Sequence, residues 1–191
     1  MFGIFATFLI LITIYLFFHL SEVLLTYIYN PSHLSWESTL ITWDYTYSVL
    51  GGLTEYILSS FFISSFKQNS FMQILGLLLI IIGELIRKVS MITAQHNFTH
   101  EVQEEKRFNH RLVDFGIYKY IRHPGYLGFL IWACGTQIFL CNILSPIAFA
   151  IILWKFFNER IQDEELNLIK FFGDEYRKYR SKTPTYIPFI K

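Results

Sequence analysis

The first 66 residues of this chain contain no lysine or arginine, although the chain has 191 residues and 16 basic side chains. The first basic residue is Lys67, and 13 of the 16 follow residue 100. Membrane proteins gather their basic residues in loops, mostly cytoplasmic loops, whereas water-soluble domains distribute charge over the whole surface. This distribution therefore predicts a membrane protein whose second half carries the cytosolic face.

Long apolar runs support this prediction. Residues 2–18 contain no charged side chain, and the run continues as a helix towards Tyr29. A helix needs about 20 residues to cross a bilayer. A signal peptide is the alternative for this run, but no basic segment precedes it and no small-residue cleavage site follows. Residues 71–86 form a second strong candidate span.

Two shorter apolar runs, 126–142 and 143–157, meet at Asn142 and Pro146. No charged residue lies between Arg122 and Lys155, so we expect a helical hairpin that leaves and returns to the same side of the membrane.

Residues 45–66 are a weaker candidate span because they include Glu55 and many hydroxyl side chains, and a helix lying in the membrane interface is the alternative. We predict an all-α integral membrane protein with about five transmembrane helices, including the C-terminal hairpin.

The basic segments 100–122 and 160–182 should both face the cytosol, which puts the N-terminus on the opposite side. We expect one domain over residues 1–191, with spans in 1–93 and a catalytic part in 94–191. The formal net charge is only +1, so no nucleic-acid partner is expected.

Two polar segments should project into the cytosol. Residues 95–123 are too long and too rich in patterned apolar residues to be a plain connector. Apolar positions recur at helical spacing in residues 158–191, which predicts an amphipathic helix over most of that segment.

The hairpin begins with Arg122-His123-Pro124-Gly125-Tyr126. Proline is favoured at the first position of a helix, so His123 should be the N-cap residue. The free N–H groups of such a helix start favour an anion at the membrane surface. An ordinary helix start with a basic anchor is the alternative.

Arg160 and Glu164 lie four residues apart where the second hairpin helix leaves the membrane, so they should share one helix face. The hairpin should bring both side chains beside His123 and Tyr126. A surface ion pair of little energetic value is the alternative. The pairing of the two motifs through the hairpin is a stronger signal than either motif alone.

His96 and His100 are also four residues apart and would lie on one face of a helix as two metal ligands. No third ligand follows at a characteristic spacing, so no metal site is predicted.

The run from Arg122 through the Trp154-Lys155-Phe156-Phe157 and Glu164-Glu165-Leu166 motifs closely resembles the isoprenylcysteine carboxyl methyltransferase family. The upstream motif HNFTHEVQ, residues 96–103, adds independent support, and the similarity covers most of the chain. Gly125 stands where the family often has serine. Members often have more N-terminal helices, so the N-terminus is expected to be shortened or incomplete.

The resemblance implies an enzyme of the endoplasmic reticulum membrane with its active site facing the cytosol. It would transfer a methyl group from S-adenosylmethionine to the C-terminal α-carboxylate of a prenylated cysteine in CaaX-processed proteins, with membrane lipid as its surroundings. Arg160 matches the substrate-contacting arginine, and Arg160 and Glu164 are the expected catalytic residues. The positions that match cofactor contacts are Gln103, His110, Arg111, Leu112, Val113, Tyr118, His123, Pro124, Gly125, Tyr126 and Glu164.

This reaction suits the residues present. A carboxylate is ionised at neutral pH and needs no general base. Arg160 can hold it by a bidentate contact, and Glu164 can offset the positive charge of the cofactor. We also expect the C-terminal segment to fold over the cofactor as a lid.

Two alternatives stay open on the sequence alone. Phosphatidylethanolamine N-methyltransferases share the Arg-His-Pro-x-Tyr motif, but their amine nucleophile must lose a proton and would need a base rather than Arg160. A non-catalytic helical membrane protein is the second alternative, and it leaves the clustered polar residues unexplained.

Overall fold

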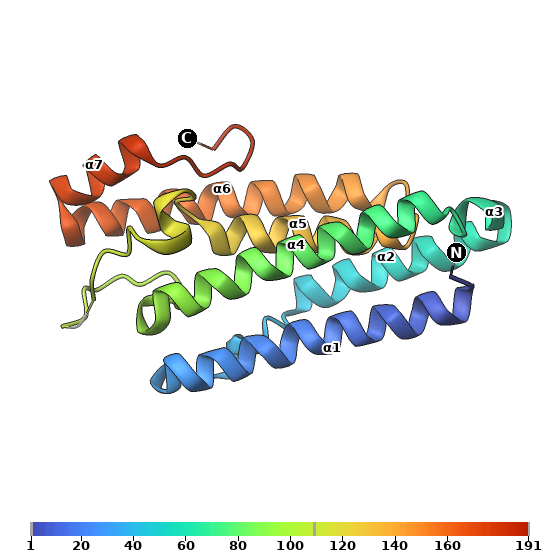
Figure 1. Ribbon diagram of the computed structural model, residues 1–191, viewed down its shortest axis with the longest axis horizontal. Coiled ribbons are helices and arrows are strands. Elements are labelled where there is room, and N and C mark those ends of the chain that lie inside the picture. Colours follow the sequence, from blue (N-terminus) through green and yellow to red (C-terminus); the bar gives the residue numbers. More distant parts are fainter. Residues whose placement is uncertain (1, 109, 191) are drawn as a thin grey trace.

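The computed structural model describes residues 2–108 and 110–190, which form helices and loops with no strand (Figure 1). Asn109 and Lys191, which belong to the two polar segments, and Met1 lie outside the described residues. The longer helices are α1 (Ile4–Tyr29), α2 (Trp43–Phe62), α4 (Ser70–Ala94), α5 (Pro124–Phe139), α6 (Ser145–Phe172) and α7 (Asp174–Lys182). Short turns of helix are η1 (Pro31–His33), η2 (Trp36–Thr39), α3 (Ser64–Lys67), η3 (Gln95–Asn97) and η4 (Gly116–Lys119).

Helices α1, α2, α4, α5 and α6 run side by side along the long axis of the molecule (Figure 1). Many large apolar side chains on their outer faces are exposed, among them Phe5, Leu20 and Phe62. Such a surface is typical of a protein that faces lipid. Among the described residues, α1 is the one helix both long enough and apolar enough to span a bilayer by length and hydropathy. The expected number of five spans therefore stays a prediction.

The hairpin has the predicted form. His123 is the N-cap residue of α5 and Pro124 lies in its first turn. Helix α6 begins at Ser145, with Pro146 in its first turn, directly after the turn that contains Asn142.

Glu55 of α2 fixes the start of α6. Its carboxylate accepts hydrogen bonds from the backbone N–H groups of Ile143 at 2.6 Å and Leu144 at 2.9 Å. It also accepts from the backbone N–H and the hydroxyl of Ser145. A carboxylate at a helix N-terminus satisfies donors that have no partner within the helix. The residue that weakened residues 45–66 as a span thus has a structural role.

Lys67 ties α3 to the same turn. Its Nζ donates to the carbonyl oxygens of Leu140 and Cys141 and to the side-chain oxygen of Asn142, at 2.8–3.3 Å. The residue is only 2% exposed. This first basic residue of the chain is therefore enclosed by protein and does not extend into a polar loop. We call the end of the bundle with Glu55 and Lys67 the closed end.

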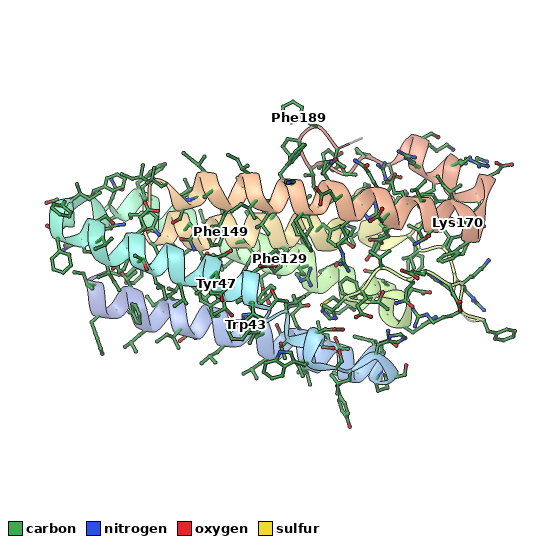
Figure 2. All side chains as sticks on the ribbon, turned by 180° about the vertical axis from the view of Figure 1, so that it is seen from behind. Trp43, Tyr47, Phe129, Phe149, Lys170 and Phe189 are labelled. Atoms are coloured by element: carbon green, nitrogen blue, oxygen red, sulfur yellow. The ribbon has the colours of Figure 1, made fainter. Side chains whose placement is uncertain are left out.

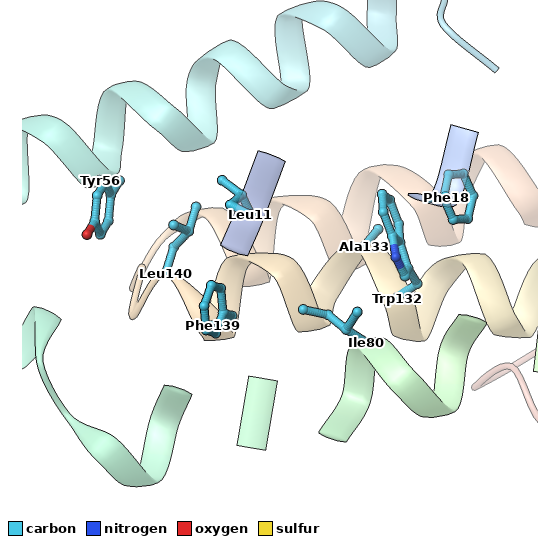
Figure 3. Packing of buried hydrophobic residues seen from close by; sticks show 8 residues of the cluster. All are labelled: Leu11, Phe18, Tyr56, Ile80, Trp132, Ala133, Phe139 and Leu140. Carbon is cyan, nitrogen blue, oxygen red and sulfur yellow. The ribbon is translucent and has the colours of Figure 1, made fainter. Parts of the chain in front are cut away.

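Helices α4 and α5 approach so closely that their backbones touch. A Cβ atom added to Gly76 of α4 would lie 2.3 Å from the backbone nitrogen of Phe139, and one added to Gly83 would lie 2.5 Å from that of Trp132. The rings of Phe18 and Trp132 stack with centroids 4.0 Å apart. Figure 3 shows the buried residues that link α1, α2, α4 and α5.

The expected helix over most of residues 158–191 is interrupted. Helix α6 continues through the first part of this segment and ends before Gly173, which has a φ of +57° that favours glycine. Helix α7 then reverses direction, and residues 183–190 return along α6 (Figure 1). There Trp154 Nε1 donates to the carbonyl oxygen of Pro188 at 2.6 Å. Phe189 projects away from the bundle (Figure 2) and is 93% exposed.

Candidate active site

A cavity lies at the end of the bundle opposite the closed end, and we call this end the cavity end. It has about 890 Å³ of space not filled by protein atoms, part of which is open to solvent. All eleven residues expected to contact a cofactor line this one cavity, although they come from the 95–123 segment, α5 and α6. Their contact with a cofactor remains a prediction. The lining residues outside that set include Phe98, Arg122, Phe171, Tyr176 and Tyr179.

Tyr126 joins the two catalytic candidates. Its hydroxyl donates to Glu164 Oε2 at 2.5 Å and accepts from Arg160 Nε at 2.9 Å. Arg160 Nη2 also donates to the backbone carbonyl of His100. His123 Nδ1 lies 3.9 Å from Glu164 Oε1. The predicted convergence of arginine, glutamate, histidine and tyrosine is therefore confirmed, with Arg160 beside the cavity and connected to it through Tyr126.

Glu165 is a residue at this end that the sequence did not single out. Its Oε1 accepts from Arg122 Nε at 2.5 Å and lies 3.2 Å from His123 Nε2, and its Oε2 lies 2.8 Å from Arg180 Nε. Burial raises the pKa of this carboxyl, but the hydrogen bond from His123 and the charge of Arg122 outweigh burial and leave the pKa below its ordinary value. Glu165 thus fixes the start of α5 against α6 and α7.

Helix α7 covers the cavity through two tyrosines. Tyr176 is 1% exposed and lines the cavity beside Tyr179. The Tyr179 hydroxyl donates to the backbone carbonyl of Tyr118 at 2.6 Å, so α7 is tied to the loop that forms the facing wall. Burial raises the pKa of both the Tyr176 and Tyr179 hydroxyls, which stay protonated near neutral pH. The expectation that the C-terminal segment folds over the site agrees with this placement.

His96 and His100 do not share a helix face. Helix α4 ends at Ala94, and Gln95 has a φ of +51° that turns the chain. His100 lies in a loop, with its Nε2 2.8 Å from Glu22 Oε2. Within residues 2–108 and 110–190, no group of three or more His, Cys, Asp or Glu side chains has the arrangement of a metal site.

Three buried polar atoms of the cavity lining have no hydrogen-bond partner among the described residues, namely His110 Nδ1, Arg122 Nη2 and the Tyr176 hydroxyl. Burial and the charges of Arg107 and Lys106 lower the pKa of His110, so its ring is neutral near pH 7. Buried polar atoms are rarely left unpaired in native proteins, and such atoms in a cavity indicate a polar ligand. Hydrogen-bonding groups, aromatic surfaces and the Glu164 carboxylate together suit a small polar ligand that carries positive charge.

An apolar exterior around a cavity that holds several polar side chains defines an all-helical membrane protein with a small-molecule site at one end of its bundle. Residues 75–170 match the model of the isoprenylcysteine carboxyl methyltransferase (ICMT) family. This chain belongs to that family.

Curated relatives of this chain have names from the same family. The chain is 43% identical over 176 residues to protein-S-isoprenylcysteine O-methyltransferase B of Arabidopsis thaliana, covering 92% of this chain and 89% of the relative. It is equally identical over 176 residues to protein-S-isoprenylcysteine O-methyltransferase of Homo sapiens, covering 91% of this chain and 62% of the relative. The chain thus spans less than two thirds of the length of the human relative.

A solved structure shares the fold. It is described as that of the eukaryotic intramembrane Ras methyltransferase ICMT without a monobody. The similarity has a TM-score of 0.93 at 37% sequence identity and covers 97% of this chain and 67% of that chain. This chain therefore has the helical fold of that intramembrane enzyme.

Proposed function

We propose that this chain transfers a methyl group from S-adenosylmethionine to the C-terminal α-carboxylate of a prenylated cysteine in CaaX-processed proteins. The observation that carries the proposal is the single cavity lined by all eleven expected cofactor contacts, with Arg160 connected to it through Tyr126. The names of the curated relatives support the same reaction.

S-adenosylmethionine supplies an electrophilic methyl group when bound. His110, Arg122 and Tyr176 supply polar atoms to hold it, and the carboxylate of Glu164 offsets its positive charge. The coverage of the site by α7 limits the access of water, which strengthens these electrostatic contacts.

Arg160 positions the nucleophile. Its guanidinium has five N–H donors, of which Tyr126 and His100 engage one each, so further donors can hold a carboxylate by two parallel hydrogen bonds. The carboxylate is ionised at neutral pH, so no residue has to act as a general base. The main contribution of the protein is then to hold both reactants in line.

The membrane arrangement follows from the same proposal. About five spans would place residues 94–191, the catalytic part, at the cytosolic surface of the endoplasmic reticulum membrane. The concentration of lysine and arginine after residue 100 supports this orientation. A prenyl chain would enter sideways from the bilayer, where each buried CH₂ group contributes about 0.8 kcal/mol. The family match does not favour the phosphatidylethanolamine alternative.

Methyl transfer from labelled S-adenosylmethionine to N-acetyl-S-farnesylcysteine tests the proposal, with membranes that carry the wild type or Arg160→Ala. We expect a base-labile methyl ester from the wild type and a fall in kcat/KM of at least about a hundredfold in the variant. Folded wild type that methylates phosphatidylethanolamine instead would contradict the proposal. An active Arg160→Ala would keep the reaction and reject the role of Arg160.

A further inference from the structure

Glu22 is a fully buried carboxylate in α1, a helix that does not line the cavity. Arg87 of α4 binds it through two parallel contacts, from Nε at 2.7 Å and from Nη2 at 2.8 Å. Lys88 Nζ donates to it at 2.5 Å. Ionisable residues within membrane-spanning segments are costly and commonly have a function. Glu22 therefore needs an explanation beyond the packing of α1.

The first connection from Glu22 to the site passes through Arg87. Arg87 Nη1 donates to the backbone carbonyl of Gly125 at 3.0 Å. Gly125 lies in the first turn of α5 and lines the cavity. Since Glu22 holds the other two nitrogens of this guanidinium, its carboxylate sets where Arg87 holds the start of α5.

The second connection passes through His100. The His100 ring contacts Glu22 Oε2 at 2.8 Å, while the backbone carbonyl of the same residue accepts from Arg160 Nη2. Arg160 extends from α6 and would otherwise have several rotamers available. Glu22 thus fixes the loop residue that, together with Tyr126, orients the guanidinium of Arg160.

We propose that Glu22 is a positioning residue for the reaction. It orients Arg160 through His100, and it fixes the position of the first turn of α5 through Arg87. The inference rests on the proposed function. It assigns α1, which lies outside residues 75–170, a direct role in the geometry of the site.

A purely structural role would not require this arrangement. Replacing a buried ion pair with apolar side chains of similar volume is often neutral for stability. A carboxylate that accepts hydrogen bonds from two basic side chains and a histidine fixes the orientation of all three. Apolar packing has no such directional preference. Small displacements of groups that hold a substrate change rates by about a hundredfold.

The test compares Glu22→Gln with a matched control, Glu55→Gln. Glu55 is also a carboxylate that joins helices by several hydrogen bonds, but it lies at the closed end. We measure kinetic constants per folded molecule, melting temperature in detergent, and binding of S-adenosylhomocysteine. Both variants should melt at lower temperature. Glu22→Gln should lose about tenfold to a hundredfold in kcat/KM and bind S-adenosylhomocysteine more weakly, whereas Glu55→Gln should keep both constants.

His100→Ala tests the connection through His100 separately from the connection through Arg87. It also provides a second test if Glu22→Gln does not fold. It keeps the backbone carbonyl that Arg160 contacts but removes the ring that Glu22 holds. We expect a higher KM for N-acetyl-S-farnesylcysteine, with S-adenosylhomocysteine binding unchanged. Variants of Glu22 and His100 that match the wild type in KM, kcat and binding would overturn the inference. A folded wild type without methyl transfer would instead reject the proposed function, and the binding of S-adenosylhomocysteine to Glu22→Gln would still decide the inference.

Discussion

The two ends of the helical bundle use buried charge in different ways. At the closed end, Lys67 and Glu55 direct their polar atoms mainly to backbone groups of the α5–α6 turn and also to the Asn142 side chain. At the cavity end, Glu165 binds Arg122, yet Arg122 Nη2 and the Tyr176 hydroxyl have no partner in the part of the chain that the structure describes. A network that pairs all its donors with protein groups joins helices, whereas one with unpaired donors beside a cavity has donors available for a ligand.

The largest expected effect comes from Glu165→Ala. The change leaves Arg122 buried without its carboxylate, and removing one partner of a buried ion pair costs about 3–5 kcal/mol of unfolding free energy. Thermal unfolding in detergent measures the loss. A melting temperature equal to that of the wild type would show that the network at the cavity end does not stabilise the fold.

Acidification sharpens this prediction through the isosteric Glu165→Gln, which does not titrate. The pKa of Glu165 is lower in the folded protein than in the unfolded chain. Its ionised carboxylate therefore stabilises the fold at pH values above the unfolded-state pKa, and this stabilisation is lost as the pH falls through the folded-state pKa. The difference in free energy of unfolding between wild type and variant should be large at neutral pH and should decrease below about pH 4.3. A difference that stays constant with pH would contradict the assigned cause of the pKa shift.

Lys67→Met tests the closed end. It removes the donor to Leu140, Cys141 and Asn142 and should cost about 1–3 kcal/mol of unfolding free energy, since their oxygens lose a partner. The kinetic constants per folded molecule should stay unchanged. Changed kinetic constants would contradict the purely structural role of the charged residues at the closed end.

Tyr126→Phe removes the hydroxyl between Arg160 and Glu164 but keeps the ring. We expect a fall in kcat/KM of about tenfold, equivalent to about 1.4 kcal/mol of transition-state stabilisation, with little change in melting temperature. The assay of methyl ester formation measures it. Wild-type kinetics in this variant would mean that Arg160 is oriented without the tyrosine.

The smallest expected effect is that of Trp154→Phe, which removes the hydrogen bond to Pro188. The loss should be about 0.5–1.5 kcal/mol, because water or a neighbouring group partly replaces an exposed hydrogen bond. Limited proteolysis should cut residues 183–190 faster. An unchanged cutting rate would show that the buried Ile187 and Ile190 hold this segment by themselves.

The sequence predicted the helices better than the contacts between them. Apolar runs identified α1, α4 and the hairpin because burial in lipid requires continuous apolar segments. The spacing of Arg160 and Glu164 identified their shared face. Eleven of the described residues that line the cavity were expected from the sequence, most of them through family resemblance, because the loop over residues 95–123 forms no long helix or strand from which its contacts follow.

Two residues with important contacts were not predicted from the sequence, and each has a physical reason. Glu165 directly follows Glu164, but successive helix residues point about 100° apart, and its partner Arg180 is brought near only when Gly173 reverses the chain. Glu22 did carry a signal, since it is the one charged residue in the 26-residue span of α1. A lone carboxylate in such a span predicts a partner within the protein.

Helix α6 runs without a break from the turn at Ser145 to Phe172. Its 28 residues make a rod of about 42 Å, longer than the hydrocarbon core of a bilayer. Arg160 and Glu164 lie on the same rod as the segment expected to cross the lipid. A bilayer of different thickness is accommodated by helix tilt, and tilt of a rigid rod displaces everything fixed to it. Lipid thickness and the height of Arg160 above the hydrocarbon are therefore mechanically linked.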